Sequence, residues 1–377
     1  MEDQIEQSVF SHVEKASKID DALLAENPLS RFKDKTHTPS GVIVEYILKE
    51  VPEFRRLSAL REQGWNNPEG DQFFEDQRRA ADYANNKTAK KFYKMMKNIA
   101  HDMHQVTGVF HIKKPCRDGC SVLDMCMAPG GFLAIALSYN PEAQALAFSL
   151  PKINGGYSVL LPKRPNVTLR FLDVTMLAED MGLSSIPHGH PDGGNFLSSQ
   201  LDSRQSFDLV ICDGQVLRNH DRADYRERRE ASRLCLTQLT LALDHLNPGG
   251  TMIVLLHKVE ALSTVQLLHT FDKFASVQLF KHTKYHAKRS SFYMLATNVR
   301  ADSEEAKTAI ERWKAQWKIA TFGTDNDYRE AMHLDMSSVE VILKEFGPRL
   351  IKLGRRIWEI QAGALENAPF MRQTPSL

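Results

Sequence analysis

The chain has 377 residues, 42% of them hydrophobic and 25% charged, which is the composition of an ordinary soluble globular protein. Its 48 basic and 47 acidic residues leave a net charge of +1, so any surface that binds a polyanion must be local. Five cysteines are sparse for this length, which favours reduced thiols and an intracellular protein, either cytoplasmic or nuclear. The first residues, MEDQIEQSVF, lack the hydrophobic core of a signal peptide, and no apolar run approaches the roughly 20 residues that span a bilayer.

Helical patterns occupy both ends of the chain. Residues 1–90 predict a helical N-terminal extension, and residues 301–377 predict a helical C-terminal extension around a central domain at 91–300. The clearest helical spacing of apolar residues is found at 40–63 and at 337–361. We expect the C-terminal helices to pack on the central domain as a cap and not to fold independently.

The central domain alternates short apolar runs with helical segments. The runs predict strands at 121–126, 145–150, 168–172, 207–212, 251–256, 276–281 and 291–297. Helices fit after the first, fourth and fifth runs, which predicts an α/β fold with a mostly parallel sheet covered on both faces. The last two runs are too close for a long intervening helix, so we expect an antiparallel edge pair. Residues 149–166 and 184–200 are interpreted as surface insertions.

The segment LDMCMAPGGFLAIAL, residues 123–137, places a Pro-Gly-Gly turn between the first strand and a helix. Pro129 fixes φ, while Gly130 and Gly131 permit left-handed φ and a close approach of another group to the backbone. The chain contains neither the ATP-binding P-loop pattern nor the dinucleotide fingerprint. The turn therefore indicates either a nucleoside-like cofactor at a helix N-terminus or a tight packing corner.

Three further polar residues follow predicted strands: Asp173, Asp213 and Lys258. Ligands of open parallel sheets bind beyond the carboxyl ends of the strands, where these side chains are expected to lie. Taken singly, each aspartate is also typical of a turn or helix cap, and the lysine is typical of a strand end that reaches solvent. The order in which the turn and these three residues occur along the chain is stronger evidence for a ligand-binding site than any one of them.

Five segments together, LDMCMAPGGF, FLDV, FDLVICDG, LNPGGTMIVLLHK and RSSFYMLAT, resemble the FtsJ-like (RrmJ-type) ribose 2′-O-methyltransferases that act on RNA. The resemblance extends from Lys94 to about Arg300. Cys126 and Gly214 are more similar to the mRNA cap branch than to the bacterial rRNA branch. The resemblance implies a Rossmann-like methyltransferase sheet that binds S-adenosylmethionine.

The resemblance also implies a set of cofactor-binding residues: Asp124, Ala128, Pro129, Gly130, Gly131, Phe132, Asp173 and Asp213. In this scheme Gly130 and the backbone of residues 128–132 hold the methionine part of the cofactor. Asp173 contacts the adenine amino group, and Asp213 lies between the cofactor and the substrate ribose.

The family's catalytic set is Lys-Asp-Lys-Glu, and its first three members are assigned by resemblance to Lys94, Asp213 and Lys258, with Lys97 as an alternative to Lys94. Methyl transfer to a hydroxyl group depends on positioning and on proton removal, for which a neutral lysine is suited. Two positions depart from the family pattern. Ser291 stands where the glutamate is expected, and Ser149 stands where an acidic residue often binds the cofactor ribose.

RNA is the expected partner, and no metal or membrane is expected. Residues 78–117 contain ten basic side chains and two acidic ones, and residues 281–289 add a basic run with Tyr285. A solvated helix face explains the first cluster equally well. Cys116 and Cys120 are not followed by a second pair with zinc-site spacing. Two alternatives stay open: a degenerate relative that binds cofactor or RNA as a scaffold, and a methyltransferase with another substrate.

Overall fold

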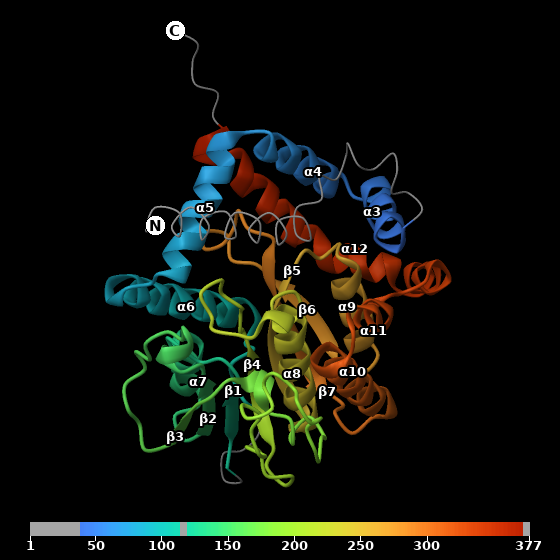
Figure 1. Cartoon of the computed structure of the whole chain (residues 1–377). Helices are drawn as coiled ribbons and strands as arrows, with labels where there is room; N and C mark the ends of the chain where they lie inside the picture. The colour runs from blue at the N-terminus through green and yellow to red at the C-terminus, as the bar shows by residue number, and fades with distance from the viewer. Residues whose placement is uncertain (1–37, 114–118, 372–377) are drawn as a thin grey trace, which may run out of the picture.

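The computed structural model describes residues 38–113 and 119–371, and Lys114, Cys116 and Arg117 lie outside these ranges. The described residues form a seven-stranded sheet in the order β3-β2-β1-β4-β5-β7-β6 (Figure 1). Its strands are β1 (Ser121–Asp124), β2 (Gln144–Ser149), β3 (Val167–Phe171), β4 (Phe207–Cys212), β5 (Leu246–His257), β6 (Ser276–Phe280) and β7 (Ser291–Val299). All seven predicted strands are confirmed.

Strand β7 lies between β5 and β6 and runs antiparallel to both, while β1 to β5 are parallel. The predicted antiparallel pairing of the last two strands is therefore confirmed. Because β7 is inserted between β5 and β6, it brings its first residues beside the carboxyl end of β5, where His257 pairs with Ser291. This edge of the sheet carries the candidate site.

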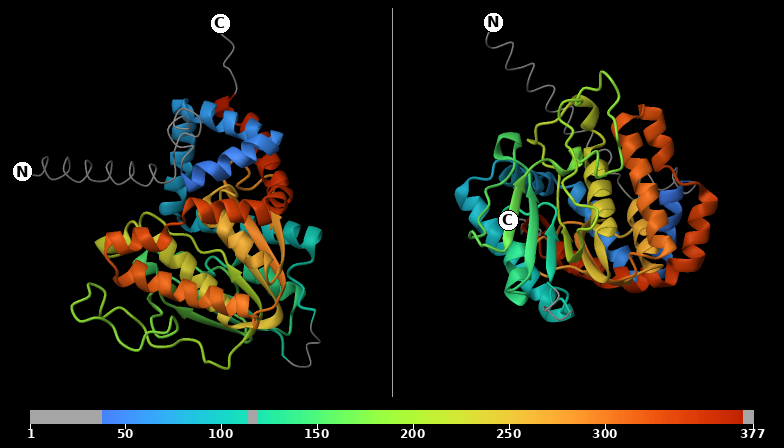
Figure 2. Two further views of the ribbon diagram at one scale, coloured as in Figure 1. Left: turned by 90° about the vertical axis from the view of Figure 1, so that its right-hand side faces the viewer. Right: turned by 90° about the horizontal axis from the view of Figure 1, so that it is seen from below.

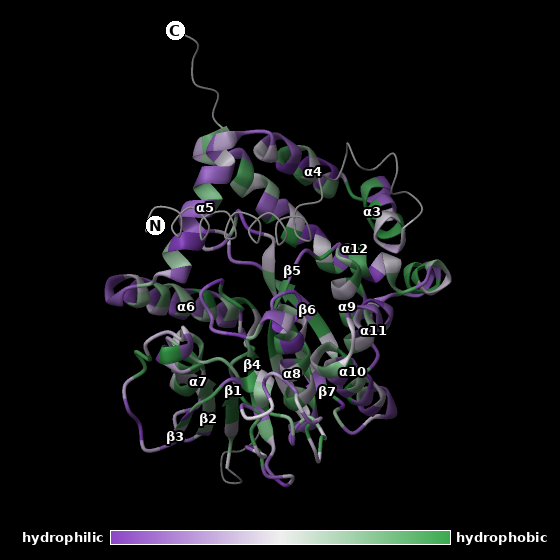
Figure 3. Cartoon of the chain, in the orientation of Figure 1, coloured by the Kyte–Doolittle hydropathy of each residue, from purple (hydrophilic) through white to green (hydrophobic). Residues whose placement is uncertain are grey.

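Helices cover both faces of the sheet, as the α/β pattern predicts. One face packs against α6 (Asn86–Thr107) and α7 (Gly131–Tyr139), and the other against α8 (Glu230–Asp244), α9 (Leu262–Asp272) and α10 (Glu304–Phe322). Alternate residues of the strands enter the two cores: Val122 and Leu209 lie in one, and Leu123 and Val210 in the other. Figure 3 shows these hydrophobic strands at the centre of the molecule, with hydrophilic residues on the surrounding loops.

Helices from the two ends of the chain pack together. The N-terminal helices are α3 (Pro39–Glu50), α4 (Pro52–Trp65) and α5 (Pro68–Asp82), and the C-terminal ones after α10 are α11 (Asp325–Met332) and α12 (Met336–Glu366). Helix α12 packs along α4 and contacts α3, α9 and β6, whereas α10 packs on α8 (Figure 2). No helix in the described ranges is long and apolar enough to cross a membrane.

Prolines set the boundaries of the N-terminal helices. The helix expected at 40–63 is divided at Val51, because Pro52 has no N–H to donate into the preceding turn and begins α4 instead. Pro68 begins α5 in the same way, with the side chain of Asn67 accepting a hydrogen bond from Glu69 N.

The two segments interpreted as surface insertions are built into the fold. In the first, Leu160 N donates to Pro129 O at 3.0 Å, so the loop after β2 lies on the Pro-Gly-Gly turn. In the second, the ring of His190 packs against Phe322 at the end of α10, with ring centroids 5.0 Å apart. The interpretation was incomplete because polar, glycine-rich loops give no periodic signal of what they cover.

Candidate active site

A cavity of about 480 Å³ lies at the carboxyl ends of the parallel strands. Its walls come from the Pro-Gly-Gly turn, the ends of β2 to β5, the start of β7, helices α5 and α6, and two loops at 150–157 and 284–289. The position is the one at which open parallel sheets bind ligands, and the volume is in the range of small-molecule sites.

The Pro-Gly-Gly turn contributes side chains to the cavity and uses its glycines for packing. Ala128, Pro129 and Phe132 line the cavity. Gly130 has φ of 102°, and a Cβ there would lie 3.0 Å from the Cβ of Leu161. At Gly131 a Cβ would lie 2.8 Å from the backbone oxygen of Tyr93 in α6, so this glycine lets α6 approach α7. The turn is therefore both a cavity wall and a packing corner.

Asp213 follows β4 and lines the cavity. Its Oδ1 atom is buried and has no hydrogen-bond partner among the described residues. Burial raises the pKa of this carboxyl group to about 7. A buried carboxylate oxygen without a donor is costly unless a ligand supplies one, so Asp213 marks the cavity as a binding site for a cationic or hydrogen-bond-donating group.

Asp124 and Cys126, at and just after the end of β1, lie next to the loop that carries Asp213. Asp124 is buried, and its Oδ1 accepts a hydrogen bond from Cys126 N at 3.3 Å. Gly214 N donates to Gln238 Oε1 at 3.0 Å, and a Cβ at Gly214 would overlap the thiol of Cys126. Cys126 and Gly214, which the sequence singled out separately, are thus in contact. Cys126 and Gly214 line the cavity, whereas Asp124 is not among the lining residues.

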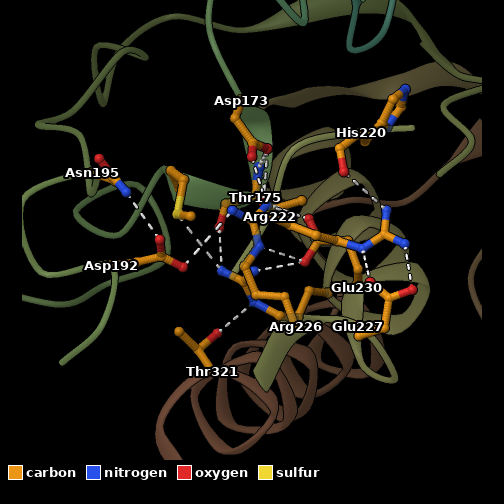
Figure 4. Close-up of polar contacts among 12 residues, drawn as sticks. Asp173, Thr175, Asp192, Asn195, His220, Arg222, Arg226, Glu227, Glu230 and Thr321 are labelled. Carbon is orange, nitrogen blue, oxygen red and sulfur yellow. Dashed lines mark hydrogen bonds and ion pairs between the residues drawn. The ribbon is translucent and has the colours of Figure 1, made fainter. Parts of the chain in front are cut away.

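Asp173 also lines the cavity and is held by an internal network (Figure 4). Its Oδ1 accepts hydrogen bonds from the backbone and hydroxyl of Thr175, at 3.0 and 2.7 Å. Its Oδ2 pairs with Arg226 at 2.6 Å, and Arg226 also binds Glu230. These contacts fix the carboxylate of Asp173, whose side chain is 19% exposed. Ser149 also lines the cavity.

Strands β5 and β7 form the wall beside Asp213. Cys212 pairs with Val254, which puts Leu255 next to Asp213, and Leu255 in turn pairs with Tyr293. The cavity-lining residues of the two strands are Leu255, His257, Ser291 and Tyr293, which alternate along each strand as one face of a sheet requires. His257 is exposed to the cavity, and the surrounding protein together with the nearby charge of Arg289 lowers its pKa to about 4, so its imidazole is neutral at physiological pH.

Two of the three residues assigned to catalysis do not line the cavity. Lys258 follows the last residue of β5, has φ of 47°, and its N–H donates to Ser290 O at 3.1 Å. Lys94 is exposed on α6, whose cavity-lining residues Phe92, Met95 and Met96 project from a different face of the helix. Of the three residues, only Asp213 therefore lines the cavity. Lys97, the alternative to Lys94, is also exposed and lies over the ring of Tyr93.

Residues of the basic run at 281–289 form another wall of the cavity. Lys281 is buried, and its Nζ donates to the carbonyl groups of Arg289 and Ser291, each at 2.7 Å. It therefore holds the loop together and is not available to solvent. Tyr285, which lines the cavity, accepts a hydrogen bond from Asn98 Nδ2 in α6 at 2.9 Å. Among the described residues, no group of three or more His, Cys, Asp or Glu side chains is arranged to hold a metal ion.

The family model for FtsJ-like methyltransferases matches residues 94–299, which is more than half of the chain. The chain belongs to the FtsJ-like methyltransferase family. S-adenosylmethionine is accordingly its methyl-donating cofactor. The sheet order and the cavity at the strand ends agree with the Rossmann-like methyltransferase fold that the sequence resemblance implied.

Known relatives of this FtsJ-like methyltransferase include the cap-specific mRNA (nucleoside-2′-O-)-methyltransferase of Autographa californica nuclear polyhedrosis virus. That protein is 27% identical over 201 residues, which cover 52% of this chain and 70% of the viral one. Solved structures are more distant. An O-methyltransferase family protein from Burkholderia thailandensis matches with a TM-score of 0.32 at 12% identity, over 65% of this chain and 72% of that one. Human methyltransferase-like protein 13 in complex with SAH matches with a TM-score of 0.33 at 12% identity, over 57% and 92% of the two chains.

The described residues fit S-adenosylmethionine, a ligand that combines an adenine nucleoside with a cationic sulfonium and an ammonium group. Asp213 lines the cavity, and its buried carboxyl group supplies negative charge for a cationic ligand. Asp173 and Ser149, which also line the cavity, present polar atoms suited to a nucleoside. Sequence reasoning missed His257 and Tyr293 as cavity residues, although the alternation from Leu255 along β5 would have placed His257, and not Lys258, on the face of Leu255.

Proposed function

We propose that this FtsJ-like methyltransferase methylates a ribose 2′-hydroxyl of RNA, in an mRNA cap or an rRNA. The viral relative, which acts on the nucleoside 2′-O position of capped mRNA, supports the cap as substrate. The observation that carries the proposal is the carboxyl group of Asp213, which lines a cavity at the strand ends and has a buried oxygen without a partner among the described residues, because a hydroxyl nucleophile needs a hydrogen-bond acceptor beside the methyl donor.

When bound, S-adenosylmethionine supplies an activated methyl group and leaves as the neutral thioether. We propose that Asp213 accepts the hydrogen bond of the attacking 2′-hydroxyl and takes its proton as the new oxygen–carbon bond forms. A pKa of about 7 suits this task, because the carboxylate is ionised at slightly alkaline pH and is basic enough to hold a proton. Most of the remaining rate enhancement comes from holding the hydroxyl in line with the methyl group.

The wall beside Asp213 orients the ribose in this scheme. The neutral imidazole of His257 and the hydroxyl of Ser291, which face each other across β5 and β7, offer hydrogen bonds without a net charge. Leu255 occupies the strand position next to Asp213, and we propose that Asp213, which lines the cavity, takes the proton. Lys258, one residue beyond His257, contributes positive charge near the phosphates of the RNA.

For the cofactor we propose that Asp173 contacts the adenine amino group and that Ala128, Pro129 and Phe132 lie against the methionine part. All four residues line the cavity. Gly130, Gly131 and Asp124 act indirectly, the glycines by shaping the turn and Asp124 by supporting Cys126 and the charge of Asp213. Ser149 replaces an acidic residue at the end of β2 and offers one hydroxyl to the cofactor ribose.

The test is methyl transfer from tritiated S-adenosylmethionine to capped RNA, uncapped RNA, total RNA and a protein extract, with Asp213→Ala as the negative control. The proposal predicts label in RNA and none with the variant. Label confined to protein would indicate another substrate. Cofactor binding in calorimetry without transfer to any of these substrates would support the scaffold alternative.

A further inference from the structure

Helix α6 carries a row of exposed lysines with no acidic partner. Lys87, Lys91 and Lys94 are spaced by four and three residues, so they lie on one face of the helix. All three are exposed, and none forms an ion pair with any part of the chain that the structure describes. Lys90 and Lys97 flank the row, and no acidic residue occurs between Lys87 and Lys97.

The row leads to the cavity. Asn98 continues the same spacing, four residues after Lys94, and its side chain donates to the hydroxyl of Tyr285. Tyr285 lines the cavity and lies on the loop that His282 anchors to α6 through Asp102, at 3.0 Å. At 1.5 Å per residue, the row from Lys87 to Asn98 is about 16 Å long, which is several nucleotides of an extended strand.

Tyr285 provides a ring at the end of this row. It is half-buried, and its ring centroid lies 4.8 Å from that of His282. Two hydrogen bonds from the backbone of Lys284 and Tyr285 to His282 Nδ1, at 2.9 and 3.0 Å, fix the local backbone. A fixed aromatic ring beside a row of cations is the combination that binds single-stranded nucleic acid, because bases stack on the ring while phosphates contact the lysines.

We propose that Lys87, Lys91 and Lys94 bind the phosphate backbone of single-stranded RNA and that Tyr285 stacks on a base at the cavity entrance. This inference rests on the proposed function, since it names the path by which the substrate reaches Asp213. It also gives Lys94 a role that its exposed position allows: Lys94 contacts phosphate and does not take part in proton transfer. A duplex does not fit the proposal, because its stacked bases cannot reach Tyr285.

The experiment measures binding of a fluorescein-labelled, single-stranded 12-nucleotide RNA to the full chain by anisotropy between 50 and 300 mM KCl. The variant Lys87→Gln/Lys91→Gln/Lys94→Gln is expected to bind at least tenfold more weakly at low salt. Its slope of log K against log salt is expected to be less steep by about 2, at roughly 0.7 for each lost phosphate contact. In methyl transfer, KM for RNA should rise while kcat changes little.

The matched control is Lys318→Gln/Lys344→Gln/Lys352→Gln, which removes three exposed lysines from α10 and α12. It is expected to leave the salt slope unchanged. For the ring, Tyr285→Ala should weaken binding about tenfold, whereas Tyr285→Phe, which keeps the ring and loses only the bond from Asn98, should bind like the wild type. S-adenosylmethionine binding, measured by calorimetry, should be the same in the two triple-lysine variants as in the wild type.

Equal salt slopes for the two triple variants, or no RNA binding by the wild-type chain, would overturn the proposal. A fall in kcat with unchanged KM would also overturn it, because that result would indicate that Lys94 takes part in the chemical step. The experiment distinguishes this inference from the proposed function. RNA binding along α6 without methyl transfer would contradict the proposed function alone. RNA methylation that does not change when Lys87, Lys91 and Lys94 are replaced would contradict this inference alone.

Discussion

Asp124 and Asp213 are neighbouring carboxylates, of which only Asp213 lines the cavity, and burial together with the charge of Asp213 raises the pKa of Asp124 well above its usual range. Asp213 itself has a pKa of about 7. Like charges in a buried site disfavour simultaneous ionisation, so the pair carries fewer than two negative charges near neutral pH. A cationic ligand in the cavity relieves this repulsion, which links cofactor binding to the charge of the pair.

Replacing Asp213 by asparagine should stabilise the ligand-free protein at pH 8 by roughly 4 kcal/mol, because it removes a desolvated charge and each pKa unit corresponds to about 1.4 kcal/mol. The sign follows from the raised pKa: ionisation of Asp213 costs stability as pH rises from its ordinary value of 3.8 to about 7. At pH 5 the gain should fall to roughly a third of this value. Thermal unfolding measures both values, with Asp221→Asn, at an exposed carboxylate on the cavity rim, as the neutral control. Equal stabilisation at both pH values would contradict the explanation.

The rate of methyl transfer should depend on the ionisation of Asp213. Because the proposed mechanism has the carboxylate form accept the hydroxyl proton, kcat/KM for S-adenosylmethionine, which reports the ionisations of the ligand-free enzyme, is expected to rise about tenfold per pH unit below pH 7 and to level off above it. His257, with a pKa of about 4, stays neutral and adds no further pH dependence in this range. The measurement is the rate of methyl transfer at subsaturating S-adenosylmethionine between pH 5.5 and 9. A rate that is flat from pH 6 to 8 would exclude Asp213 as the proton acceptor.

Asp173→Ala should weaken S-adenosylmethionine binding by tenfold or more, since Asp173 lines the cavity where the adenine is expected. Its loss also removes a partner of Arg226 and lowers stability. The matched control is Asp192→Ala: Asp192 is buried in the same network, 3.8 Å from Arg226, but lies outside the cavity lining. Calorimetry should find weaker binding only for Asp173→Ala. Similar affinities for both variants would mean that Asp173 acts only through the fold.

The buried pair Arg61–Glu260 should hold the helical layer to the sheet. Arg61 lies 2.6 Å from Glu260, whose other oxygen accepts from Trp358 Nε1 of α12 at 3.1 Å. Arg61→Met leaves the carboxylate buried without its cation and should cost about 3–5 kcal/mol of unfolding free energy at pH 7. Urea unfolding measures this cost, and the double variant Arg61→Met/Glu260→Gln should recover part of it.

The pH dependence of the same pair has a defined sign. Although burial acts in the opposite direction, Arg61 holds the pKa of Glu260 below its ordinary value of 4.5. The stability it contributes is therefore present above pH 4.5 and is lost as pH falls through the lower, folded-state pKa. The difference between the wild type and Arg61→Met should shrink over that interval. A difference that grows on acidification would contradict the assignment.

The sheet was predictable because each strand is a short, buried apolar run, and the Pro-Gly-Gly turn and Asp213 were predictable because they follow such runs. Lys94 and Lys258 were harder. Helical periodicity predicts that α6 is amphipathic but does not predict which of its residues line the cavity. The position of Lys258 depends on how β5 pairs with β4 and β7. The link between Asp173 and Arg226 joins residues 53 positions apart and leaves no local signal.

The most direct test of the account is nucleoside analysis of RNA methylated by the purified full chain with S-adenosylmethionine. After complete digestion, mass spectrometry distinguishes a methyl group on the ribose from one on the base. The account predicts a 2′-O-methylnucleoside that is absent when Asp213→Asn replaces the wild type. Methyl groups found only on bases, or an equal yield of 2′-O-methylnucleoside from Asp213→Asn, would contradict it.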